Sequence, residues 1–140
     1  MKIRYDFVTN SSSTSFIIIS DGEFNLKKFI DAVGIEKESP FIDLYKDLFE
    51  SFKYSMSPAR EYYEQCNSSR EYSTFEDFVK SWFWYGKELL PKILDAESQG
   101  KQVFLGGLRS DNGEIEGFFC TDEFIIEADG LHIDARENGW

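Results

Sequence analysis

Residues 1–20 read M-K-I-R-Y-D-F-V-T-N-S-S-S-T-S-F-I-I-I-S, and this stretch decides the fold. In residues 3–7 apolar and charged side chains alternate, which is the pattern of a strand with one buried face. Residues 16–19 form a continuous apolar run, which is typical of a strand covered on both faces. The polar residues between them, 9–14, predict a loop, so the whole stretch predicts a β-hairpin.

Helices are predicted after this hairpin. A first helix over residues 25–33 is followed by Gly34, and glycine is a common residue just past a helix end. Ser39-Pro40 is a start signal, because serine caps a helix and proline suits its first position. The apolar residues that follow recur at helical spacing and predict an amphipathic helix over residues 41–52.

Two more helices are predicted before the C-terminal part. Ser57-Pro58 repeats the start signal ahead of a short helix. Residues 73–76 have capping-box spacing and open the longest helix, which we expect to end near Gly100. Pro91 falls inside this helix and should kink or break it, because proline removes a donor and crowds the preceding turn.

The C-terminal part predicts two hairpins, and the first lies around Asn112-Gly113. This dipeptide is the strongest short turn signal, and it separates two strand-like runs, 103–109 and 115–120. Arg109 would then face Glu116 as a favourable cross-strand pair.

Asp129-Gly130 predicts the second hairpin, between residues 124–128 and 131–135. A two-residue turn there places six apolar side chains on one face as three opposed pairs, Ala128–Leu131, Ile126–Ile133 and Phe124–Ala135. On the other face Glu127 opposes His132.

Together these elements predict a single α+β domain over residues 1–140. Its antiparallel sheet combines the N-terminal hairpin with a C-terminal β-meander, because a lone hairpin is marginal in water. Three to four helices from the middle of the chain are expected to pack on one face of that sheet.

The composition is that of a folded, acidic protein. The chain has 140 residues, is 41% hydrophobic and 17% aromatic, and carries a formal net charge of −11. No apolar run approaches the roughly 20 residues that span a bilayer, and the start lacks the apolar segment of a secretory signal. We therefore expect a cytoplasmic protein without membrane contact. The two cysteines lack a paired metal spacing, and we predict no metal and no cofactor.

The negative charge is concentrated towards the C-terminus. Residues 111–140 hold nine acidic side chains and one basic one, a net charge of −8. Such a surface disfavours direct binding to nucleic acid, which needs basic side chains, and favours a basic protein partner. The carboxylates proposed to contact that partner are Glu114, Glu116, Asp122, Glu123, Glu127 and Asp134.

A run of four aromatic residues at positions 82–85 supplies further candidates. At 100° per residue, four consecutive positions sweep most of the way round a helix and cannot all enter one core stripe. The helix is therefore either sandwiched between two layers or exposes some of these rings. Trp84 and Tyr85 lie off the buried stripe, and exposed aromatic residues are typical of an interface with a partner or a second copy in a homodimer.

The polar loop of the first hairpin is a candidate anion or ligand site, formed by Asn10, Ser11, Ser12 and Ser13. Backbone N–H groups and hydroxyls of such a loop can hold a phosphate. A polar loop in which these side chains bond their own backbone explains the same residues. The loop lacks the lysine and glycine spacing of a P-loop.

His132 is the only histidine of the chain. With Glu127 opposite and Asp134 on the same face, it offers a general base or a metal ligand, and with a loop serine it would complete a Ser–His–Asp set. No nucleophile elbow accompanies it. A solvated His–Glu pair is therefore favoured, and no catalytic residue is assigned.

Residues 7–16, F-V-T-N-S-S-S-T-S-F, resemble an N-terminal signature of short, uncharacterised bacterial and phage proteins. The usual form of that signature is close to F-V-S-N-S-S-S-S-S-F, so Thr9 and Thr14 stand here in place of serines. The resemblance implies a bacterial or phage origin and a shared role for the N-terminus. It carries over no activity.

These observations favour a non-catalytic interaction protein of bacterial or phage origin, whose acidic surface engages a basic partner. An inhibitor of a nucleic-acid-processing enzyme, of the anti-CRISPR or anti-restriction kind, is one concrete form, and a toxin-immunity protein is another. The alternative is a small-ligand or phosphate-binding protein, including an enzyme, that uses the serine-rich loop.

Overall fold

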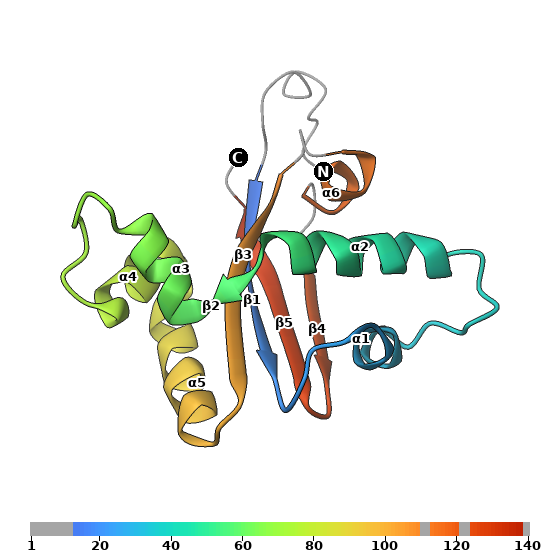
Figure 1. The fold of residues 1–140 in the computed structure, drawn as a ribbon, viewed down its shortest axis with the longest axis horizontal. Coiled ribbons are helices and arrows are strands. Elements are labelled where there is room, and N and C mark those ends of the chain that lie inside the picture. The colour runs from blue at the N-terminus through green and yellow to red at the C-terminus, as the bar shows by residue number, and fades with distance from the viewer. Residues whose placement is uncertain (1–12, 110–112, 121–123, 139–140) are drawn as a thin grey trace.

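The computed structural model describes residues 13–109, 113–120 and 124–138. Within these ranges the chain forms six helices and a five-stranded antiparallel sheet, which confirms the predicted α+β class (Figure 1). Four of the five strands lie towards the two ends of the chain, whereas one two-residue strand and most of the helices come from its middle. Residues 3–7 and the loop residues 9–12 lie outside the described ranges. The predicted hairpin is nevertheless wrong, because residues 16–19 are paired on both edges by later segments of the chain and leave no edge for a preceding strand.

Strand β1 (Ser13–Ser20) is the central strand of the sheet. The strand order is β2-β3-β1-β5-β4, and β1 pairs antiparallel with β3 (Gln102–Arg109) on one side and with β5 (Leu131–Asn138) on the other. The edges are β2 (Ser57–Pro58) and β4 (Phe124–Ala128). The apolar run at residues 16–19 is buried, as predicted.

Two helices are capped close to the predicted signals, whereas the predicted serine caps at Ser39-Pro40 and Ser57-Pro58 are wrong, because Phe41 and Pro58 hold the cap positions there without a side-chain hydrogen bond. The Oδ1 atom of Asn25 accepts a hydrogen bond of 2.9 Å from the backbone N–H of Lys28, and Gly34 ends the same helix with a φ of 80°. Thr74 caps a later helix in the same way. The six helices are α1 (Leu26–Val33), α2 (Ile42–Ser55), α3 (Ala59–Cys66), α4 (Phe75–Trp82), α5 (Gly86–Ser98) and α6 (Glu114–Cys120).

Helices cover both faces of the sheet, whereas the sequence predicted cover on one face. Ile17 and Ile19 pack in a core with α3, α4 and α5, while Phe16 and Ile18 pack in a second core with α1, α2 and α6 (Figure 1). Because successive side chains of a strand point to opposite faces, four consecutive apolar residues need apolar cover on both sides. The run in β1 itself predicts the two-sided packing.

The longest predicted helix is two helices, and the break is not at Pro91. Helix α4 ends at Trp82, Phe83 takes an extended conformation (φ −110°, ψ 132°), and α5 then continues through Pro91. Phe83 and Tyr85 are buried in the core with 1% and 3% of their surface exposed. A continuous helix would spread these aromatic side chains around its axis. Because the chain leaves the helix at Phe83, Phe83 and Tyr85 both reach the same core.

The predicted hairpin at Asn112-Gly113 is wrong, because residues 114–120 form α6. Residues 110–112 lie outside the described ranges. Ile115 and Phe119 are four positions apart, so a helix brings them to one face, where they pack on the second core. A short apolar run does not distinguish a helix from a strand, and here the packing of Ile115 and Phe119 on the second core stabilises the helix.

The hairpin at Asp129-Gly130 has the predicted register. Strands β4 and β5 are antiparallel, with all three predicted apolar pairs opposed and Glu127 opposite His132. Strand β5 then continues alongside β1, with Ile18 opposite Ile133. The second hairpin therefore extends the sheet outwards from its central strand.

Gly106 is expected to tolerate no side chain, because it lies opposite Phe16 in the sheet. A Cβ at Gly106 would lie 2.5 Å from Cζ of Phe16 and 3.1 Å from Cα of Met56, whereas a Cβ at Gly107 would have its nearest neighbour, the carbonyl oxygen of Thr14, at 3.7 Å. Gly106→Ala should lower the free energy of unfolding by about 1–3 kcal/mol. The matched variant Gly107→Ala should change it by less than about 0.5 kcal/mol. Urea unfolding of both variants measures this, and equal effects would contradict it.

Candidate functional site

Of the candidate residues in the serine-rich loop, the structure describes only Ser13. Ser13 is the first residue of β1 and is exposed. Asn10, Ser11 and Ser12 lie outside the described residues. An anion or ligand site in this loop therefore stays a prediction.

The candidate carboxylates do not form one acidic surface. Glu114 and Glu127 are exposed, whereas Glu116 and Asp134 are buried, with 7% and 1% of their surface exposed. Two further candidates, at positions 122 and 123, are among the residues that the structure does not describe. The acidic surface predicted from the sequence thus loses two of its members to internal contacts.

Glu116 lies at the first turn of α6 and binds the end of a strand. Its Oε1 atom accepts a hydrogen bond of 3.0 Å from the backbone N–H of Arg109. The sequence predicted that these two residues face each other across a hairpin. They do meet, but through a helix that folds back on β3, and the carboxylate bonds the backbone.

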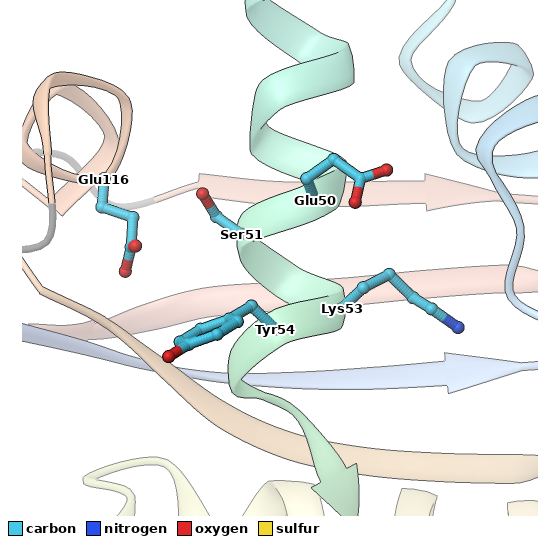
Figure 2. Close-up of a pocket in the computed structure, with 5 residues that line it drawn as sticks. All are labelled: Glu50, Ser51, Lys53, Tyr54 and Glu116. Atoms are coloured by element: carbon cyan, nitrogen blue, oxygen red, sulfur yellow. The ribbon is translucent and has the colours of Figure 1, made fainter.

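Glu116 also lines a pocket of about 610 Å³ between α2 and α6 (Figure 2). Ser51 and Tyr54 lie on the side of α2 that faces Glu116, whereas Glu50 and Lys53 extend away from it (Figure 2). The pocket is polar and open. Its lining includes no imidazole that would activate Ser51, so the geometry offers contacts to a polar group and no nucleophile.

Asp134 is held by Arg136. The guanidinium Nη2 lies 2.8 Å and Nε 3.0 Å from carboxylate oxygens of Asp134, and this hydrogen bonding raises the pKa of Arg136. The same guanidinium lies over the ring of Tyr85, 4.5 Å from its centroid. A buried carboxylate with two strong hydrogen bonds serves the fold.

Trp84 and Tyr85 separate in the structure. Trp84 keeps 66% of its surface exposed, as expected of an interface residue, and its Nε1 donates a hydrogen bond of 3.3 Å to the carbonyl oxygen of Arg136. Tyr85 is buried and joins the core, so it is not available to a partner. The aromatic candidate surface is reduced to one exposed ring.

His132 and Glu127 pair across β4 and β5, as predicted. The Nδ1 atom of His132 lies 3.3 Å from Oε1 of Glu127, and the side chains are 15% and 73% exposed. The Nε2 atom of His132 is buried without a hydrogen-bond partner among the described residues. Asp134 is hydrogen-bonded to Arg136 rather than to His132, so the Ser–His–Asp set considered from the sequence is not assembled in the described part of the chain.

A thiol and a phenol on α3 are also poor nucleophiles. Burial raises the pKa of Tyr62 to about 12, and burial raises the pKa of the Cys66 thiol. A nucleophile needs the opposite shift, towards the ionised form. Neither group is prepared for reaction at neutral pH.

An apolar groove beside β4 was missed by the sequence analysis. It has a volume of about 340 Å³, and Ile125 at its rim is 46% exposed. Glu127 is the one charged side chain in its lining. A signal was present: the register that places Phe124, Ile126 and Ala128 on the apolar face leaves Ile125 on the polar face. The lining residues are Ala32, Val33, Tyr45, Leu48, Phe119, Phe124, Ile125, Ile126 and Glu127.

The role of Glu116 in stability can be tested against a neighbouring glutamate. Glu116→Ala leaves the N–H of Arg109 without its acceptor and should lower the free energy of unfolding by about 1–3 kcal/mol. Glu114→Ala removes an exposed charge from the same helix turn and should cost about 0.3–1 kcal/mol, the size of a helix-dipole effect. Chemical denaturation of both variants measures the difference. A Glu116 variant as stable as the Glu114 variant would show that the buried contact contributes nothing.

Comparison with known proteins leaves the function to be argued from these residues. No family model, curated protein or solved structure matches the chain. Among the described helices none is long and apolar enough to cross a membrane. The described residues also contain no cluster of three or more histidine, cysteine, aspartate or glutamate side chains placed to hold a metal ion.

Proposed function

We propose that the protein is a non-catalytic interaction protein that engages a basic protein partner through the surface around β4. The groove beside β4 carries this proposal. It combines an exposed isoleucine, an apolar lining and a single charged group, which is the carboxylate of Glu127. An apolar centre with a charged rim is the usual anatomy of a specific protein interface.

The charge of the protein supports a basic partner. The chain has a formal net charge of −11, which attracts a positively charged protein and accelerates its encounter. Among the described candidate carboxylates, Glu114 and Glu127 are the exposed ones. We assign the contact with the basic partner to these two carboxylates, because Glu116 and Asp134 are buried.

A nucleic-acid-processing enzyme is the class of partner that fits this charge best. Such an enzyme carries a basic groove for phosphates, and an acidic protein can occupy it. The N-terminal resemblance to bacterial and phage proteins supports an inhibitor of this kind, and it equally supports a toxin-immunity protein. Exposed Trp84 would add a second contact, since tryptophan is enriched among residues that dominate binding energy.

A display of random dodecapeptides selected on the immobilised protein tests the proposal. Peptides rich in lysine and arginine should be enriched, and their affinity should fall as sodium chloride is raised, because opposite charges attract less when screened. Glu127→Lys should weaken the selected peptides about tenfold, an effect of roughly 1.4 kcal/mol. Affinities follow from fluorescence anisotropy.

The control makes the same charge change elsewhere. Glu71 is exposed in the segment between α3 and α4. Glu71→Lys should change the affinity by less than about twofold. A display that enriches no basic peptides, or equal losses in the two variants, would refute a basic partner at β4.

A further inference from the structure

We infer that the partner contributes an extended segment of alternating apolar and basic residues, which binds as an added strand along β4. The inference rests on the proposed function and specifies how the partner binds. Strand addition uses backbone hydrogen bonds for affinity and alternate side chains for specificity. Four features of the described residues support it.

The first feature is the contrast between the two edges of the sheet. Edge β2 has two residues and contains Pro58, and both features protect an edge from pairing. Edge β4 has five residues, Phe-Ile-Ile-Glu-Ala, without proline or lysine. Natural proteins usually block such an edge, so an unprotected one is suited to receive another strand.

The second feature is the backbone direction along β4. Ala128 opposes Leu131 across the two-residue turn, and such a pair is hydrogen-bonded in both directions. Hydrogen-bonded and non-hydrogen-bonded pairs alternate along an antiparallel ladder. Ile126 is therefore bonded to β5, while Ile125 and Glu127 direct their N–H and C=O groups to the outer edge, with which no described strand pairs. These groups can pair with an added strand.

The third feature is the position of the groove. Four consecutive residues of β4, from Phe124 to Glu127, line it, although their side chains alternate between the two faces. Because the groove contacts side chains on both faces of β4, it runs along the edge of that strand. Its other side is formed by Ala32 and Val33 of α1 and by Tyr45 and Leu48 of α2. An added strand would thus lie between β4 and these helices.

The fourth feature is the chemistry on the two sides of that strand. Side chains turned towards α1 and α2 would meet apolar groups, which favours valine, isoleucine or leucine. The intervening side chains would lie beside Ile125 and Glu127, and Glu127 is 73% exposed. Opposite charges on neighbouring strands attract each other, which favours lysine or arginine there. A second copy of this chain carries the same net charge of −11, which opposes its approach.

Hydrogen exchange followed by NMR tests the inference directly. The probe is the capped heptapeptide Lys-Ile-Lys-Val-Lys-Ile-Lys. At saturation it should slow exchange at the amides of Ile125 and Glu127 at least about tenfold, because they gain hydrogen bonds. The amide of Ile126, already bonded within the sheet, should change less. Failure of the heptapeptide to bind, or binding without protection at Ile125 and Glu127, would overturn strand addition.

Variants of protein and peptide separate backbone pairing from side-chain contact. Ile125→Pro removes an outward N–H but leaves the ladder to β5, whereas Ile125→Ala keeps that N–H. The proline variant should bind the heptapeptide at least about tenfold more weakly than the alanine variant, with thermal unfolding as the check on folding. Equal affinities would overturn the inference.

Methylated peptides repeat the test on unchanged protein. N-methylation of alternate residues in one register should abolish binding, and in the other register should preserve it, since only alternate peptide N–H groups face β4. Equal tolerance in both registers would overturn strand addition. Enrichment of basic peptides in the display would still support the proposed function in that case, so the two can fail separately.

Discussion

The burial of β1 on both faces is the constraint on which the rest of the structure depends. Four consecutive apolar side chains cannot be covered from one side, so the strand needs a helical layer above and another below. It also needs a strand on each edge, since buried backbone groups must be hydrogen-bonded. Strands β3 and β5 provide these partners, and in the sequence α6 and β4 lie between them.

The two helical layers do not extend equally far across the sheet, and the difference creates the candidate site. Strand β1 is enclosed, whereas β4 at the outer edge keeps Ile125 half exposed and borders an apolar groove. Elsewhere the chemically prominent side chains serve the fold: Glu116 bonds the end of β3, and Asp134 bonds Arg136. The proposed interaction surface thus lies at the outer strand of the sheet, beside residues of α1, α2 and α6.

The sequence predicted those features of the fold that depend only on residues close together in the chain. The caps at Asn25 and Thr74 and the register around Asp129-Gly130 needed only nearby residues. The sequence could not decide between strand and helix at residues 115–120, because the packing against α2 that stabilises the helix comes from distant residues. For the same reason, a list of carboxylates did not distinguish exposed Glu127 from buried Asp134. That distinction depends on Ile17, which lies opposite Asp134 in β1, and on Tyr85, whose ring lies against the Arg136 guanidinium that binds Asp134.

The central position of β1 also has a consequence for synthesis of the chain. Ser20 pairs with Gln102 and with Leu131, so neither edge of β1 is covered until much of the polypeptide has been made. Closing such long loops is entropically costly, and sheets built from distant segments fold slowly. During synthesis the apolar run of β1 is therefore expected to stay exposed until β3 and β5 have been made. Transiently exposed apolar segments of this kind are prone to aggregate, so the segment that organises the finished fold is also a liability in the nascent chain.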